Sequence, residues 1–143
     1  MAKQLLFQDV EVGSAVPTLV KNPNSQQLVK WAGASGDYYQ IHYDKDFAIT
    51  KNLPGIIVHG RLKSAFLVQM LTDWIGADGE LRKFTCSYRG MDYPDQTMTC
   101  KGAITKKYTQ GKDNCVECDI WAENPKGEKT TIGTALVILP SKA

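Results

Sequence analysis

One segment of the chain, residues 60–75, has apolar side chains around most of its circumference when it is drawn as a helix. A surface helix of a globular protein keeps a polar face, whereas a helix that is apolar on nearly all sides is buried. We therefore expect this helix to lie in the middle of the fold, buried rather than half-exposed. Its apolar residues are Leu62, Ala65, Phe66, Leu67, Val68, Met70, Leu71, Trp74 and Ile75.

The part of the chain after Gly79 is typical of β-strands. Turn-forming residues interrupt it at residues 92–95, 110–113 and 124–127, which leaves four long strands. Strands joined by short turns pair antiparallel, and here they must also cover the buried helix. The sequence therefore predicts an α+β fold in which an antiparallel sheet wraps around one long buried helix.

The first half of the chain supplies shorter elements. A helix over residues 25–34 is expected to begin at Asn24 or Ser25 and to end at Gly33 and Gly36. Its packed face would carry Leu28, Trp31 and Ala32. Two further elements are expected, a strand over residues 15–20 and a helical turn over residues 44–50.

Size and charge restrict the classes of function. A chain of 143 residues that is 43% hydrophobic can bury one core, so we expect a single domain over residues 1–143. Seventeen basic and fifteen acidic residues give a net charge of +2, too little for a nucleic-acid-binding protein. The sequence has no apolar run of membrane-spanning length and no signal-peptide core, so we expect no membrane association and a cytoplasmic location.

The four cysteines include one Cys-x-x-Cys pair, Cys115 and Cys118. Residues 114–123 alternate between apolar and polar, which predicts a strand with Cys118 on the apolar face and Cys115 on the opposite face. The chain has no second pair at metal-site spacing. We therefore expect reduced thiols rather than a zinc site or a disulfide.

Both histidines of the chain fall in one region, and Asp37 lies five residues before the first of them, His42. The two residues share a loop between a helix end and a helical turn, which can aim both side chains at one cavity. An imidazole exchanges protons near neutral pH, and a nearby carboxylate can orient it or share the proton transfer. The alternative is structural: Asp37 as a turn or capping residue and His42 as a half-buried histidine.

The second histidine, His59, and Gly60 open the apolar helix. A helix N-terminus has free N–H groups and favours negative charge, so the Gly60 amide is a candidate oxyanion donor. The alternative is that Gly60 only permits tight packing. Arg61 and Lys63 oppose the helix dipole, and we expect both to be solvent-exposed, with anion binding as a weaker alternative.

Other kinds of site are less well supported. Asp37, His42, Asp44 and His59 could be combined as metal ligands, but no two of them lie at ligand spacing on one element, so we expect no metal. Phosphate-binding glycine motifs and a nucleophile elbow are both absent from the sequence. Covalent catalysis therefore has no good candidate residue.

Residues 34–44, followed by Phe47-Ala48 and residues 55–60, resemble the MaoC-like dehydratase family, which includes the R-specific enoyl-CoA hydratases (hydratase 2). The family signature is Ser-Gly-Asp, any residue, Asn-Pro-Ile/Leu-His, any residue and Asp, with a later Ile/Val-x-His-Gly. The spacing from Asp37 to His42 matches, as do Asp44 and the pair His59-Gly60. The order of elements also matches the hot-dog fold of that family.

The resemblance implies a role for each matching residue. Asp37 and His42 would hold the water that adds across an enoyl double bond, one removing its proton and the other protonating the α carbon. Gly60 would donate its amide to the thioester carbonyl. The same match makes His59, Tyr39 and Gly55 further candidates for the oxyanion and substrate-binding site. No metal or redox cofactor is implied, because the thioester itself stabilises charge at the α carbon.

One departure from the signature is plain, because Tyr39-Gln40 replaces its Asn-Pro. The loop loses a rigid ring and an amide and gains a bulky phenol. This change predicts altered substrate choice or a loss of catalysis. Retention of both Asp37 and His42 favours a working enzyme.

The resemblance therefore predicts reversible hydration of a trans-2-enoyl thioester to an (R)-3-hydroxyacyl thioester, carried on coenzyme A or acyl carrier protein. A homodimer is expected, because proteins of this family pair their sheets. Two alternatives stay open. One is a hot-dog acyl-CoA thioesterase, and the other is a non-catalytic acyl-binding chain or partner subunit of a hot-dog heteromer.

Overall fold

The computed structural model describes residues 3–142. Two short 3-10 turns, η1 (Phe7–Asp9) and η2 (Gln40–His42), accompany the helices and strands. In chain order these are β1 (Ala15–Lys21), α1 (Ser25–Ser35), α2 (Lys45–Thr50), α3 (Gly60–Ile75), β2 (Glu80–Tyr88), β3 (Met98–Gln110), β4 (Asp113–Glu123) and β5 (Lys129–Ile138).

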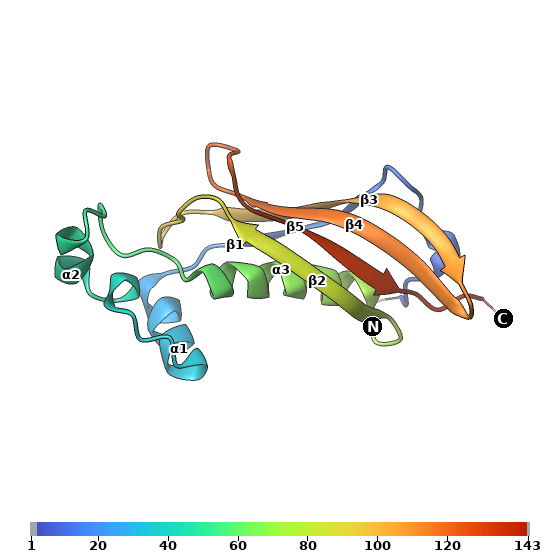
Figure 1. Ribbon diagram of the computed structural model, residues 1–143, viewed down its shortest axis with the longest axis horizontal. Helices are drawn as coiled ribbons and strands as arrows, with labels where there is room; N and C mark the ends of the chain where they lie inside the picture. The colour runs from blue at the N-terminus through green and yellow to red at the C-terminus, as the bar shows by residue number, and fades with distance from the viewer. Residues whose placement is uncertain (1–2, 143) are drawn as a thin grey trace.

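Within the described residues the strands form one five-stranded sheet in the order β1-β3-β4-β5-β2, and every neighbouring pair is antiparallel. Figure 1 shows the sheet arching over α3, with α1 and α2 projecting past one end of it. β1 and β2 are the two edge strands. The predicted α+β hot-dog arrangement, a sheet wrapped around one long helix, is confirmed.

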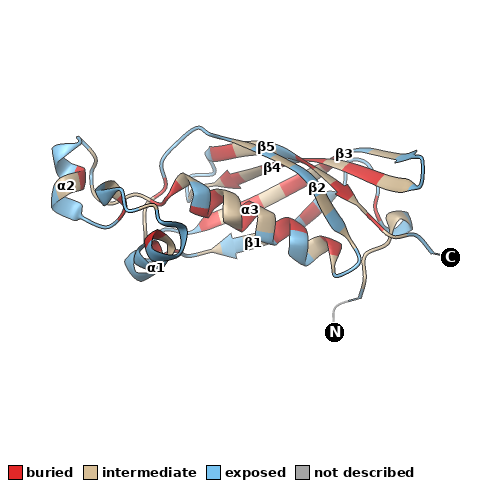
Figure 2. Cartoon of the chain, turned by 60° about the horizontal axis from the view of Figure 1, so that its bottom comes forward, coloured by how far each residue is buried: buried red, intermediate tan, exposed pale blue. Residues whose placement is uncertain are grey.

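The core lies between α3 and the inner face of the sheet (Figure 2). Val116, Cys118, Ile120 and Ala122 alternate along β4, and each is at most 1% exposed because it faces the helix. The prediction that α3 is buried rather than half-exposed is wrong for one face, on which Gln69, Thr72 and Asp73 are exposed. A single curved sheet covers only one side of a helix. The α3 residues in the core are Leu62, Phe66, Leu67, Met70, Leu71 and Ile75.

Helix α1 begins and ends through specific caps. The Gln27 N–H donates to the Asn24 side chain at 2.9 Å, as an N-cap requires. Gly36 ends the helix with φ of 79°, and its N–H donates to the Ala32 carbonyl. The prediction that Gly33 helps to end the helix is wrong, because Gly33 lies inside it and the αL turn is made at Gly36.

All four cysteines lie within the described residues, and all are free thiols, as predicted. Burial raises the pKa of both Cys100 and Cys118 to about 12, which keeps these thiols protonated. Cys115 points to the opposite face from Cys118, yet it is only 3% exposed. Its cross-strand neighbours Tyr108 and Ile138 flank it.

The prediction that Lys63 is solvent-exposed is wrong. Its side chain is 2% exposed, and its ammonium group lies 2.9 Å from the carboxylate of Asp92, also 2% exposed. The long aliphatic stem of a lysine can cross apolar surroundings when the ammonium meets a partner, and Asp92 supplies one from the loop after β2. Arg61 is exposed, as predicted.

No helix between residues 3 and 142 combines the length and the apolar character that a membrane crossing requires.

Candidate active site

The loop between α1 and α2 carries Asp37 and His42, and it is fixed at both ends. Gly36 ends α1 in the left-handed conformation. At the other end, the Phe47 N–H donates to the Asp44 side chain at 3.0 Å, which caps α2. The His42 N–H donates to the Tyr39 carbonyl at 3.1 Å within the η2 turn. The loop is short and closed by hydrogen bonds, so it presents the two side chains in a defined orientation.

Asp37 uses its two carboxylate oxygens differently. Oδ1 accepts the Tyr39 N–H at 3.4 Å, which is the turn role expected of an aspartate here. Oδ2 lies 3.9 Å from Nε2 of His42, and the Asp37 side chain is 42% exposed. The turn role and a role in proton transfer are therefore compatible, because they involve different oxygens.

His42 is held by a backbone carbonyl. Its Nδ1 lies 2.8 Å from the Ile57 oxygen, and the residue is 7% exposed. A carbonyl oxygen can only accept, so Nδ1 carries a proton and donates it. In the neutral ring this leaves the lone pair on Nε2, the nitrogen that faces Asp37.

His59 lies behind His42 rather than at the surface. It is fully buried, its ring centroid is 3.9 Å from that of His42, and the two planes differ by 20°. Its Nε2 lies 3.4 Å from the Asp37 carbonyl, and Nδ1 has no hydrogen-bond partner among residues 3–142. Burial, followed by the proximity of His42, lowers the pKa of His59, so its ring is neutral near pH 7.

Gly60 is the first residue of α3, directly after His59. A residue at this position has an N–H with no acceptor within its own helix. A β-carbon built on Gly60 would lie 3.2 Å from the ring of Tyr88. The contact with Tyr88 agrees with the packing alternative for Gly60, and it does not conflict with the predicted role of the Gly60 amide as an oxyanion donor.

The other two predicted substrate-binding residues, Tyr39 and Gly55, lie outside the cluster of Asp37, His42 and His59. The Tyr39 ring is 48% exposed and meets the rings of His42 and Phe47 edge-on, with centroids 6.3 and 5.9 Å apart. Gly55 lines a separate hollow of about 390 Å³ with Ile56 and other residues. The structure thus brings Asp37, His42 and His59 together and puts Tyr39 beside them, whereas Gly55 lines the separate hollow.

Asp37, His42 and His59 also form the group that could hold a metal ion, since one donor atom from each lies within 4.8 Å of the others. The hydrogen bonds from the rings to backbone carbonyls leave Nε2 of His42 and Nδ1 of His59 free, as in many metal-binding histidines. The stacking of the rings disfavours a shared ion, because lone pairs in two nearly parallel planes lie side by side rather than pointing toward one position. Asp44, the fourth residue considered from the sequence, caps α2 instead.

Two contacts could not be expected from the sequence. The Ile57 carbonyl orients His42, but every residue has a carbonyl, so the sequence carries no signal for it. The Tyr88 ring covers Gly60 from β2, a strand that runs along the far edge of the sheet. The alternation of β2 marks Tyr88 only as a strand residue.

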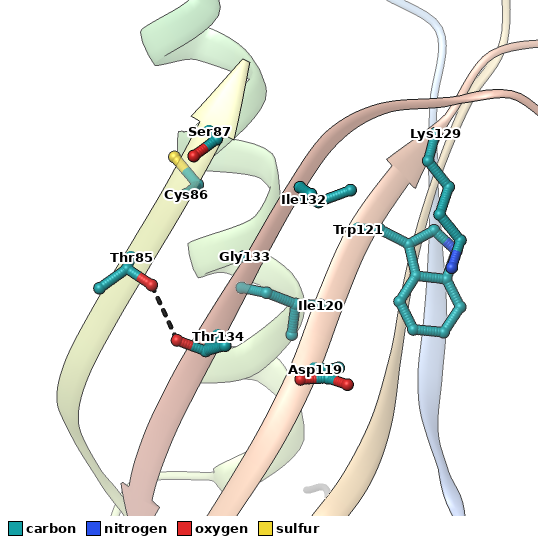
Figure 3. Close-up of a pocket in the computed structure, with 10 residues that line it drawn as sticks. All are labelled: Thr85, Cys86, Ser87, Asp119, Ile120, Trp121, Lys129, Ile132, Gly133 and Thr134. Atoms are coloured by element: carbon teal, nitrogen blue, oxygen red, sulfur yellow. Dashed lines mark hydrogen bonds between the residues drawn. The ribbon is translucent and has the colours of Figure 1, made fainter. Parts of the chain in front are cut away.

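One hollow lies beside α3, and another lies on the sheet. A groove of about 680 Å³ follows the exposed side of α3, with Arg61 and Ser64 near Gly60 and with Ala65, Val68 and Phe84 farther along. The other, of about 490 Å³, lies on the outer side of the sheet (Figure 3). None of the residues that line this second hollow belongs to the segments that carry Asp37, His42 or Gly60.

Comparison with known proteins gives the family. Residues 7–124 match the family described as the MaoC like domain. The chain belongs to the MaoC-like domain family. The match covers both histidines, Asp37 and all of α3, so it includes the whole cluster described above.

This MaoC-like domain is similar to proteins that are named as hydratases. It is 25% identical over 142 residues to the (R)-specific enoyl-CoA hydratase of Rhodospirillum rubrum, a match that covers 95% of this chain and 92% of that protein. The unliganded R-hydratase PhaJ1 from Pseudomonas aeruginosa superimposes with a TM-score of 0.88 at 20% identity, over 97% of this chain and 88% of that one. The structural similarity shows that the two share a fold.

The domain is also similar to parts of much longer proteins. It is 39% identical over 82 residues to the fatty acid synthase beta subunit TOXC of Cochliobolus carbonum. That match covers 55% of this chain and 4% of the fungal protein, so the chain spans only a small fraction of this relative. The family match and the similarity to the hydratases support membership of a hydratase and dehydratase family.

Proposed function

We propose that this MaoC-like domain catalyses the reversible hydration of a trans-2-enoyl thioester to an (R)-3-hydroxyacyl thioester, with coenzyme A or acyl carrier protein as the carrier. The observation that carries the proposal is the 3.9 Å separation between Asp37 Oδ2 and His42 Nε2. That distance is too long for a direct hydrogen bond, so both atoms are free to bond to one small molecule between them. A water held there would be positioned for addition to a double bond.

The proton balance of the reaction requires one group to act as base and the other as acid. Because Nδ1 of His42 is hydrogen-bonded to the Ile57 carbonyl, the imidazole must carry the reacting proton on Nε2. The base takes a proton from water as its oxygen bonds to the β carbon, and the acid gives its proton to the α carbon. One proton then passes between Asp37 and His42 to restore the starting state. The reverse sequence is the dehydration.

The Gly60 amide is the proposed donor to the thioester carbonyl oxygen. Negative charge develops on that oxygen as the β carbon is attacked, and a fixed N–H at a helix N-terminus stabilises it. His59 connects this amide to the acid-base pair, since it precedes Gly60 and stacks on His42. The amide and the imidazole therefore belong to one rigid unit.

The groove along α3 is the proposed site of the acyl chain. It begins beside Gly60 at Arg61 and Ser64 and continues between Ala65, Val68 and Phe84. Small and apolar side chains of this kind suit a hydrocarbon chain. Tyr39, exposed and edge-on to His42, is the residue proposed to adjust which substrates enter.

A homodimer is part of the proposal. β2 is an edge strand of nine residues, and its outer side pairs with no strand among residues 3–142. Such an edge invites pairing with a second copy. A related structure is titled as a ChsH1-ChsH2 complex from Mycobacterium tuberculosis, at 21% identity, so a heteromer is the competing arrangement. Light scattering of the purified domain, alone, distinguishes a dimer from a monomer that lacks its partner.

The proposed reaction is tested by its product. The purified domain is incubated with trans-2-enoyl-CoA thioesters of increasing length, and the 3-hydroxyacyl product is resolved by chiral chromatography. The proposal requires the R enantiomer and no release of free thiol. Free coenzyme A without hydroxyacyl product would instead favour the thioesterase, and binding without turnover would favour a non-catalytic acyl-binding chain.

A further inference from the structure

The buried ion pair of Lys63 and Asp92 is unusual for a domain of this size. Both side chains are 2% exposed, and the lysine lies in the first turn of α3, where its charge opposes the helix dipole. Removing two charges from water is costly, and an apolar pair of similar volume is often as stable or more stable. Stability alone therefore does not account for this pair.

The pair fixes the loop that follows β2. The Lys63 ammonium donates to the Gly90 carbonyl at 2.8 Å as well as to Asp92 Oδ2 at 2.9 Å. The hydroxyl of Thr130, at the start of β5, donates to the same Asp92 oxygen at 2.6 Å. The Arg89 and Gly90 N–H groups both donate to the Thr130 carbonyl. The loop is thus held from α3 on one side and from β5 on the other.

The same loop holds the segment that orients His42. The backbone carbonyl of Asp92 accepts the Val58 N–H at 2.8 Å. The preceding residue, Ile57, offers its carbonyl to Nδ1 of His42 at 2.8 Å, while its own N–H donates to Ile41 at 3.1 Å. A continuous series of hydrogen bonds therefore runs from Lys63 through Asp92 and residues 57–58 to the imidazole.

We propose that Lys63 and Asp92 are positioning residues: their buried pair sets the location of residues 57–58 and so the orientation of His42. The consequence for turnover depends on the proposed function, whereas the consequence for the His42 ring does not. Misplacement of a catalytic group by about 1 Å can reduce a rate by about a hundred-fold. The pair would thus contribute to catalysis without touching the substrate.

The chain offers a matched control. Lys101 and Glu123 form an ion pair of the same 2.9 Å length across β3 and β4, with side chains 40% and 17% exposed. None of the hydrogen bonds described for Lys101 or Glu123 leads to residues 57–58. Replacing this pair tests the effect of losing an ion pair without disturbing the path to His42.

The experiment compares the apolar double variant Lys63→Met/Asp92→Leu with the control Lys101→Met/Glu123→Leu. The first is expected to fold, with kcat reduced about 10- to 100-fold and KM nearly unchanged. The control is expected to keep the kcat of the unaltered protein. Asp92→Asn, which keeps the volume and an acceptor for Thr130, replaces the double variant if the latter fails to fold, and kcat is again expected to fall.

A second readout needs no substrate. With only two histidines, ¹⁵N spectra of the imidazoles are assigned from His59→Gln, and the Nδ1–H signal of His42 reports its bond to Ile57. This signal is expected to weaken or exchange faster in the Lys63/Asp92 variants and not in the control. An unchanged His42 signal in a folded variant overturns the proposal. Absence of hydratase activity in the unaltered protein would overturn the proposed function. The Nδ1–H signal of His42 would still test whether Lys63 and Asp92 orient that ring.

Discussion

His42 and His59 lie face to face, with ring centroids 3.9 Å apart and planes within 20° of parallel. Only His42 reaches the Asp37 carboxylate with Nε2, whereas His59 is fully buried behind it. Two charged rings at this distance would repel each other, so a neutral His59 is compatible with the proton that the proposed mechanism places on His42. In that proposal, His42 is the reacting imidazole and His59 supports it.

The buried His59 predicts a specific dependence of stability on pH. Its pKa is lowered below the ordinary 6.5, first by burial and then by His42. The unfolded chain therefore binds a proton at a higher pH than the folded chain does. The free energy of unfolding should fall as the pH drops from about 6.5 toward the folded-state pKa, and this contribution should be complete above pH 7. Urea unfolding between pH 5 and 7.5 measures it.

His59→Gln is the control for that titration. The variant should be less stable overall, but its free energy of unfolding should change less between pH 6.5 and 5 than that of the unaltered protein. Equal slopes would mean that His59 does not resist protonation in the folded state. Acidic residues titrate mainly below this range, so they affect both proteins alike.

His42→Ala should remove turnover while leaving a folded protein. General acid-base catalysis by one group contributes about 10²–10⁴-fold, and the loss should be of that size. The truncation leaves a small cavity over His59 and should cost about 1–3 kcal/mol of stability. Steady-state kinetics and urea unfolding separate the two effects.

A chelator should leave the activity of the unaltered protein unchanged, and strong inhibition by it would point to a metal.

Gly60→Ala tests whether turnover needs open space over the Gly60 amide. The new β-carbon would lie 3.2 Å from the ring of Tyr88, which is 48% exposed and can move aside. We expect a change in melting temperature of no more than about 4 °C, together with a clear loss of kcat as the displaced ring crowds the amide. Adding Tyr88→Ala should restore part of the activity. If the double variant is no better than Gly60→Ala, crowding by Tyr88 is not the cause.

Tyr39→Asn should change substrate preference more than it reduces the rate. The Tyr39 ring is exposed and lies edge-on to His42, so its removal should open that side of the proposed site to larger or differently shaped acyl groups. Values of kcat/KM across a series of enoyl-CoA chain lengths provide the measurement. A profile that keeps its shape would argue against a role for Tyr39 in selecting the substrate.

How far the sequence could predict the structure depended on the range of the interactions. Helix α3 was predicted with its bounds, because the apolar run from Gly60 to Ile75 is a local signal. Asp37 and His42 were expected to meet because one short loop carries both. The partner of Lys63 could not be foreseen, since Asp92 lies 29 positions away and reaches it only through the folding of the sheet edge.

The same limit explains why the sequence could not predict the stacking of the two histidines or which glycine ends α1. His42 and His59 are both visible in the sequence, but their stacking depends on how the segment before α3 crosses the loop after α1. Gly33 and Gly36 look equally able to end a helix. Only Gly36 has the left-handed φ of 79°, which is a property of the folded backbone rather than of the residue type.

The most direct test of the account follows the loss of the conjugated enoyl-thioester absorbance when the purified domain meets crotonyl-CoA and longer or branched enoyl-CoAs, with Asp37→Asn measured alongside. Asp37 Oδ2 is one of the two atoms proposed to hold the water. We predict that the unaltered domain hydrates at least one of these thioesters and that Asp37→Asn, with the same melting temperature, does so about 10²–10⁴-fold more slowly. Hydration by Asp37→Asn at the rate of the unaltered domain would contradict the account.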